Sequence, residues 1–197
     1  ARDREARINR LRTAQVNMKA GWRSDAQKRW NWYPASHHRI WSEVNACMTK
    51  DTILAWSPGN QQTGLIANYV EKTVPGQWYR SPSAALGMHG YAIGVQLANP
   101  DKRVIGGMGD WEAHQGALWN NLYTCAHHRI PVVWFILDNQ SGATVRSSHF
   151  GFRQAIYDYA MQGKPRYWSV ELDNPRLDYV RLAASMGIPG RYVDRAA

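Results

Sequence analysis

Two apolar runs, at residues 104–108 and 131–137, contain no alternating polar positions. Such uninterrupted runs are typical of parallel strands that are buried on both faces. The segment between them carries apolar residues at helical spacing, at Ala117, Leu118, Leu122 and Cys125. This strand–helix–strand order predicts a βαβ unit in a parallel sheet.

The rest of the chain predicts further alternating elements. The residue pattern favours strands over 51–56 and 78–80 and the start of another at Tyr192-Val193. Helices are expected over 36–48, with Ser36 as the N-cap, and over 62–71, 81–98 and 178–186. We therefore expect an α/β fold, a three-layer sandwich with a mostly parallel central sheet.

Charge separates the start of the chain from the remainder. Residues 1–34 hold nine Lys or Arg and three acidic residues, and so carry most of the net charge of +9. They predict a solvated helix or basic linker broken at Gly21, and the domain itself is expected over residues 35–197, truncated at its C-terminal end. No run is long enough for a membrane span, and two cysteines without a pattern favour buried free thiols and a cytoplasmic location.

Oxygen-bearing side chains follow both central strands. Asp110 ends the first strand, and Asp138-Asn139 end the second. The carboxyl ends of parallel strands meet at one edge of a sheet, where ligands bind. With the Ser141 carbonyl, Asp110 and Asn139 offer hard oxygens of the kind that hold Mg²⁺ beside a diphosphate. The alternative is that Asp110 caps its own helix and Asn139 lies in an ordinary loop.

The two motifs resemble the signature of thiamine diphosphate-dependent enzymes. Gly109-Asp110 and Asp138-Asn139 are separated as in its usual form, Gly-Asp-Gly, roughly 25 residues, then Asn-Asn. Residues 92–105 and 171–187 are similar to the flanking segments of benzoylformate decarboxylase and acetolactate synthase-like enzymes. The resemblance covers about 36–193, the diphosphate-binding domain of that family.

This resemblance implies cofactors, partners and site residues. The cofactors are thiamine diphosphate and Mg²⁺, with Asp110, Asn139 and Ser141 as the metal ligands. The cofactor-binding residues it implies are Ser83, Ala85, Leu86, Gly109, Asp110, Trp111, Glu112, Asn139, Ser141 and Gly142. The activating glutamate belongs to a pyrimidine-binding domain or subunit, which no segment of this chain resembles. The implied activity is decarboxylation or carboligation of a 2-oxo acid by a homo-oligomer, a dimer or tetramer.

Three positions depart from the family pattern. Trp111 stands where the family has glycine, Asp138 replaces the first asparagine, and Glu112 echoes the transketolase-like branch. One alternative is therefore a non-catalytic domain that has lost the cofactor, with Trp111 as the reason. Another is a nucleic-acid-binding protein that uses residues 1–34, although nucleic acid is not the expected partner.

Overall fold

A computed structural model describes residues 2–57, 66, 69–71, 74–80, 90–116, 118–142, 171–173 and 175–195. The chain divides into two compact units. The first comprises Ala1–Thr49, Gly64–Lys72 and Val193–Ala197, and the second comprises Lys50–Thr63 and Thr73–Tyr192. The expected helix over 62–71 and the first half of the one over 81–98 fall largely outside the described residues.

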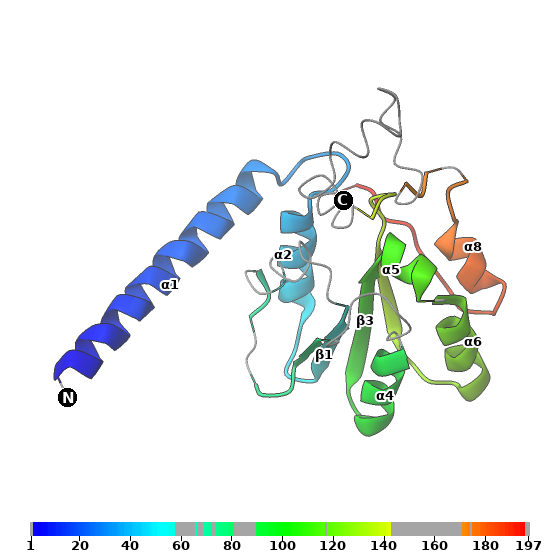
Figure 1. Cartoon of the computed structure of the whole chain (residues 1–197), viewed down its shortest axis with the longest axis horizontal. Coiled ribbons are helices and arrows are strands. Elements are labelled where there is room, and N and C mark those ends of the chain that lie inside the picture. Colours follow the sequence, from blue (N-terminus) through cyan, green and yellow to red (C-terminus); the bar gives the residue numbers. More distant parts are fainter. Residues whose placement is uncertain are drawn as a thin grey trace, which may run out of the picture. The chain divides into compact units, whose positions relative to one another are not determined.

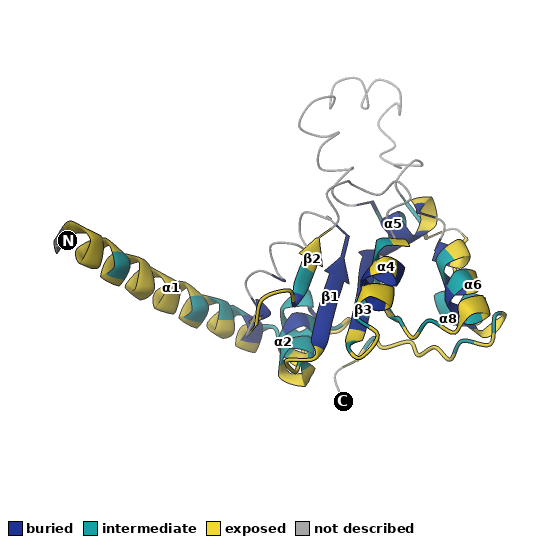
Figure 2. Ribbon diagram, turned by 90° about the horizontal axis from the view of Figure 1, so that it is seen from below, coloured by how far each residue is buried: buried dark blue, intermediate teal, exposed yellow. Residues whose placement is uncertain are grey.

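Two helices form most of the first unit (Figure 1). Helix α1 (Arg2–Lys28) is exposed along most of its length, which confirms the predicted solvated helix (Figure 2). The break expected at Gly21 is wrong, because the helix continues through it; a Cβ there would meet no atom within 4 Å. Helix α2 (His37–Cys47) begins as predicted, since the Ser36 hydroxyl accepts the Arg39 N–H at 3.3 Å.

The second unit is built on a four-stranded parallel sheet in the order β2-β1-β3-β4. The strands are β1 (Thr52–Trp56), β2 (Trp78–Arg80), β3 (Arg103–Gly109) and β4 (Val133–Leu137). All four lie within or next to the runs that predict them. The α/β class and the parallel sheet are therefore confirmed.

In the described part of this unit, four helices pack against one face of the sheet. They are α4 (Gly90–Ala98), α5 (Asp110–Gln115), α6 (Leu118–His128) and α8 (Tyr179–Ala184). One core cluster joins α4 to β1 and β3 through Ile53, Val95 and Val104. A second joins Met108 of β3 to α5, α6 and α8. The single helix expected between β3 and β4 is thus two helices, α5 and α6, on either side of Gly116.

Two glycines at the centre of β3 are enclosed by tryptophans of the neighbouring strands. Gly106 pairs with Trp134 of β4, and Gly107 pairs with Trp56 of β1. A Cβ at Gly107 would lie 1.6 Å from the Trp56 ring, and one at Gly106 would lie 3.0 Å from the Trp134 ring. Successive residues of a strand face opposite sides, so the two indoles lie on opposite faces of β3.

Three expectations about exposure and order are wrong. Strand β4 is not fully buried, because it lies at the edge of the described sheet and Val133 is 48% exposed. Residues 192–193 are irregular rather than a strand. Both cysteines are free, but only Cys125 is buried, since Cys47 lies at the exposed end of α2.

Candidate metal and diphosphate site

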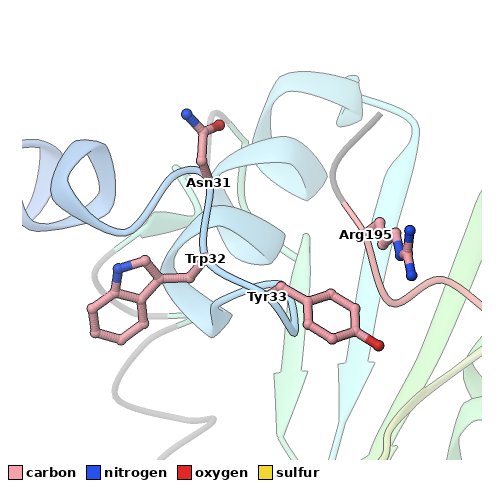
Figure 3. A pocket seen from close by; sticks show the side chains of 4 residues that line it. All are labelled: Asn31, Trp32, Tyr33 and Arg195. Carbon is pink, nitrogen blue, oxygen red and sulfur yellow. The ribbon is translucent and has the colours of Figure 1, made fainter.

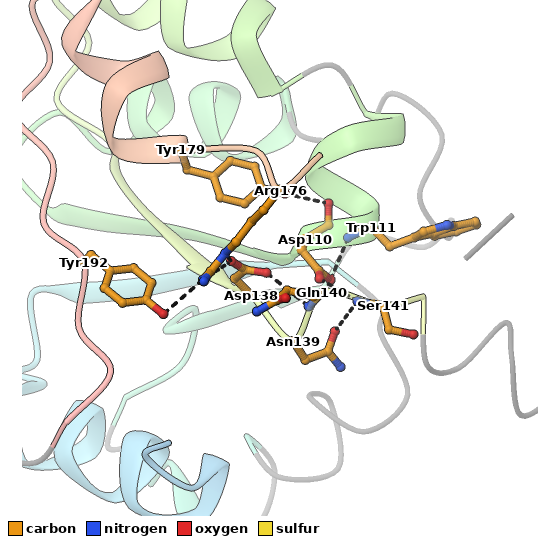
Figure 4. A network of polar contacts seen from close by, with 9 residues as sticks. All are labelled: Asp110, Trp111, Asp138, Asn139, Gln140, Ser141, Arg176, Tyr179 and Tyr192. Carbon is orange, nitrogen blue, oxygen red and sulfur yellow. Dashed lines mark hydrogen bonds and ion pairs between the residues drawn. The ribbon is translucent and has the colours of Figure 1, made fainter. Parts of the chain in front are cut away.

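The polar ends of β3 and β4 meet because the two strands are parallel and in register. Gly109 is paired with Leu137, so the residues that follow each of them lie side by side (Figure 4). Asp110 accepts the Trp111 N–H through Oδ1 at 2.8 Å and the Ser141 N–H through Oδ2 at 2.9 Å. The carboxylate therefore joins the start of α5 to the loop after β4.

The Asp110 carboxylate is buried, at 2% exposure. Burial raises its pKa to about 6, and the nearby Asp138 adds to this, while the N–H groups of Trp111 and Ser141 act in the opposite direction. In the described part of the chain no ion pair reaches Asp110. A buried carboxylate is costly unless it is paired or coordinates a metal, so the site suits a cation.

The loop after β4 presents its oxygens through two consecutive side-chain turns. Asp138 Oδ1 accepts the Gln140 N–H at 3.1 Å, and Asn139 Oδ1 accepts the Ser141 N–H at 3.2 Å. Gln140 adopts the left-handed region with φ 58°, which is strained for a residue with a side chain. The Ser141 hydroxyl is buried and has no partner among the residues that the structure describes. Buried hydroxyls in folded proteins usually bond to a protein group or to ordered water.

Glu112 ties the start of α5 to the neighbouring strand. It lies at the third position of the helix, is 8% exposed, and accepts the Gly109 N–H at 2.8 Å. It also accepts the hydroxyl of Ser57, which directly follows β1. This is half of a capping box, because Gly109 has no side chain for the reciprocal bond. The N–H groups of Gly109 and Trp111 are thus already engaged, and a bound diphosphate would have to exchange with these partners.

The Trp111 side chain lies away from the Asp110 carboxylate in Figure 4. Its indole packs against Gly142, where a Cβ would come within 2.9 Å of the ring. The indole therefore fills no space between Asp110 and Asn139. It packs on the loop that carries Ser141.

The structure brings together seven of the residues expected at the site. These are Gly109, Asp110, Trp111, Glu112, Asn139, Ser141 and Gly142. The remaining three, Ser83, Ala85 and Leu86, lie outside the described residues.

Sequence reasoning missed three residues around the site. The Tyr179 hydroxyl donates to the Asp110 carbonyl oxygen at 3.2 Å. The Arg176 guanidinium donates to Asp138 Oδ2 at 2.7 Å through Nη2 and at 3.1 Å through Nε. The same Nη2 contacts the Tyr192 hydroxyl at 3.0 Å. No spacing rule connects these residues to the motifs, so only the folded chain reveals them.

A second polar surface lies in the first unit. A shallow depression is lined by Asn31, Trp32, Tyr33 and Arg195 (Figure 3). The Arg195 guanidinium lies 5.1 Å from the centre of the Tyr33 ring, and that of Arg29 lies 5.4 Å from the Trp32 ring. These arginines are stacked on aromatic rings of their own chain. Nucleic-acid binding by residues 1–34 stays an alternative and is not the expected function.

Among the described residues, no group of three or more His, Cys, Asp or Glu side chains is arranged to hold a metal ion. No helix in the same residues is long and apolar enough to cross a membrane. The candidate metal site contains a single buried carboxylate, that of Asp110 at the start of α5, beside the loop after β4.

A family model described as "Thiamine pyrophosphate enzyme, C-terminal TPP binding domain" matches residues 59–197. The chain belongs to this family. Thiamine pyrophosphate is another name for thiamine diphosphate, so the family is the one that the two motifs resemble.

Individual members of the thiamine diphosphate family show the same relationship. The chain is 30% identical over 158 residues to a benzoylformate decarboxylase of Pseudomonas aeruginosa, covering 79% of this chain and 27% of that protein. It is 25% identical over 163 residues to the acetolactate synthase isozyme 1 large subunit of Escherichia coli, covering 79% and 25%. The chain thus spans about a quarter of the length of these relatives.

A solved structure agrees with the sequence relationship. The thiamine diphosphate-dependent 4-hydroxybenzoylformate decarboxylase of Rhodococcus jostii RHA1 superposes with a TM-score of 0.67 at 25% identity, over 83% of this chain and 28% of that chain. Domains of this family normally bind thiamine diphosphate and Mg²⁺. The donors present fit a magnesium ion, because Asp110 and Asn139 supply oxygen ligands and both bond to the backbone of Ser141.

Proposed function

We propose that the second unit is the diphosphate- and Mg²⁺-binding part of a thiamine diphosphate enzyme that decarboxylates or carboligates 2-oxo acids. The observation that carries the proposal is the convergence of the buried Asp110 carboxylate with Asn139 and Ser141 at neighbouring strand ends. A pyrimidine-binding domain or subunit outside this chain would supply the activating glutamate. The proposal includes a cytoplasmic homo-oligomer, a dimer or tetramer.

The chain's own residues would hold and orient the bound group. Asp110, the Asn139 side chain and the Ser141 carbonyl would bind Mg²⁺, and the start of α5 would face the diphosphate. When bound, thiamine diphosphate supplies the electron sink needed to break or form the bond beside the substrate carbonyl. Glu112 and Tyr179 fix the backbone on either side of the Asp110 carboxylate, so the metal ligand keeps one orientation.

The names of the relatives support this branch of the family. One is a benzoylformate decarboxylase and another is an acetolactate synthase subunit. Their names place a decarboxylase and a synthase among the relatives, so both reaction types belong to the proposal.

A second candidate is a domain of the same fold that has lost the cofactor. Two observations favour it: Trp111 replaces the signature glycine, and the N–H groups of Gly109 and Trp111 already bond to carboxylates. In that case the buried Asp110 would serve only to join α5 to the loop after β4.

Calorimetric titration with Mg²⁺ and thiamine diphosphate tests the proposal. The chain is expected to bind thiamine diphosphate only when Mg²⁺ is present, and Asp110→Asn is expected to abolish this binding while keeping the side-chain shape. Asp101→Asn, in an exposed turn, is the matched control and should bind normally. Absence of binding, restored by Trp111→Gly, would favour the domain that has lost the cofactor. A salt-dependent shift with RNA that disappears on deleting residues 1–34 would support nucleic-acid binding instead.

A further inference from the structure

Asp138 places a second carboxylate beside the proposed metal site. It follows β4 directly, one residue before Asn139, at a position where the resembled family has a neutral asparagine. It lies on the same edge of the sheet as Asp110, because the residues that precede them, Leu137 and Gly109, are paired (Figure 4). An unpaired carboxylate there would add a second negative charge to the site. That charge would repel the anionic diphosphate that is expected to bind with the magnesium ion.

Arg176 is bonded to this second carboxylate. Two of its nitrogens donate to the same oxygen, Asp138 Oδ2, at 2.7 and 3.1 Å. The other oxygen of Asp138 accepts the Gln140 N–H at 3.1 Å. Both carboxylate oxygens therefore have partners inside the chain, and the Asp138 side chain is 14% exposed.

Arg176 is itself fixed from the opposite side. Its Nη2 contacts the Tyr192 hydroxyl at 3.0 Å, and its guanidinium carbon lies 5.2 Å from the centre of the Tyr192 ring. Figure 4 shows the guanidinium between Asp138 and Tyr192, on the side of Asp138 away from Ser141. A half-exposed arginine alone would bind a carboxylate weakly. An arginine side chain that a tyrosine already holds in place loses less conformational entropy when it forms the ion pair, so the pair is stronger.

We propose that Arg176 is a positioning residue that neutralises Asp138 and keeps it out of the metal shell. This proposal rests on the proposed function. Among the described residues the site then offers one carboxylate without a cationic partner, that of Asp110, to a magnesium–diphosphate complex. The departure from asparagine at position 138 is compensated within the chain by the cation at position 176.

Removal of Arg176 should have opposite effects on two ligands. In Arg176→Gln the freed Asp138 carboxylate would attract a bare divalent cation, and Mn²⁺ alone is expected to bind about tenfold more tightly. The same negative charge would repel the diphosphate, so Mg²⁺–thiamine diphosphate is expected to bind about threefold to tenfold more weakly. A purely structural role would weaken both ligands together.

A double-mutant cycle on the full chain tests this. Mn²⁺ binding is followed by electron paramagnetic resonance without cofactor, and Mg²⁺–thiamine diphosphate binding by calorimetry. Asp138→Asn with Arg176→Gln removes both charges, so both affinities are expected to return to within about twofold of the unmodified chain. Arg181→Gln, which removes an exposed arginine paired with Asp178, is the matched control and should change either affinity by less than about threefold.

Two outcomes would overturn the proposal. One is a Mn²⁺ affinity that is unchanged or lower in Arg176→Gln. The other is a double variant that stays as weak for thiamine diphosphate as Arg176→Gln, which would mean that Arg176 contacts the diphosphate directly. If the unmodified chain binds no thiamine diphosphate, the proposed function fails, while the Mn²⁺ measurement still decides the role of Arg176.

Discussion

Replacement of Gly107 by alanine is expected to destabilise the sheet strongly. A Cβ at this position would lie 1.6 Å from one ring carbon of Trp56 and 1.9 Å from another. The indole has little room to move, because it is 1% exposed and lies 5.9 Å from the Phe135 ring centre. Overpacking a core usually costs about 1–3 kcal/mol. A displaced buried indole should reach about 3 kcal/mol, which lowers the Tm by about 6–12 °C for a chain of this length.

Urea and thermal unfolding followed by circular dichroism measure this change. Gly94→Ala is the matched control, because Gly94 is exposed in α4 and a Cβ there meets no atom within 4 Å. That substitution should stabilise the chain by about 0.5–1 kcal/mol through helix propensity. A Gly107→Ala variant as stable as the unmodified chain would refute the packing of Trp56 over β3. Adding Trp56→Val should recover part of the loss.

Three further outcomes follow from the site and from the turn before β3. The Mg²⁺ affinity should be constant above about pH 7 and should fall by nearly tenfold for each pH unit below about pH 5. The reason is that burial raises the Asp110 pKa to about 6, and only the ionised carboxylate binds metal. Calorimetric titrations that give the same Mg²⁺ affinity at every pH would exclude Asp110 as a ligand. Gln96→Leu should lower the free energy of unfolding, measured in urea, by about 2–4 kcal/mol. The buried amide of Gln96 donates to the carbonyls of Asn99 and Lys102 and accepts the Val104 N–H. A decrease below about 0.5 kcal/mol would contradict these hydrogen bonds. Glu112→Gln should lose about 1–2 kcal/mol by the same assay and Glu112→Ala more, and equal losses would argue against the carboxylate as an acceptor.

The strands and the meeting of Asp110 with Asn139 could be predicted from the sequence. Each strand is an apolar run closed by polar or turn-forming residues, and short runs of this kind depend mainly on local sequence. Once β3 and β4 are parallel neighbours, the residues after them must share one edge of the sheet. The pairing of Gly109 with Leu137 confirms that β3 and β4 end side by side.

The partners of these elements could not be predicted, because they depend on tertiary packing. Arg176 lies 38 residues from Asp138 in sequence, and nothing in its local pattern distinguishes it from other surface arginines. The sequence predicts that Val133 is buried, and this is wrong for the same reason. An apolar run does not reveal whether its strand lies at the edge of a sheet. Register is likewise a property of the folded sheet, so the contact of Gly107 with Trp56 has no signal in the sequence.

The two glycines of β3 also affect which substitutions the core of the protein can accept. The central strand contributes no side chains of its own at positions 106 and 107, and its two surfaces there are covered by Trp134 and Trp56. A substitution at Trp56 opens space on one surface only, and a substitution at Trp134 opens it on the other. The core on the helix-bearing side of the sheet and the core on the other side thus rest on different tryptophans at the centre of β3, and a change of one leaves the other in place.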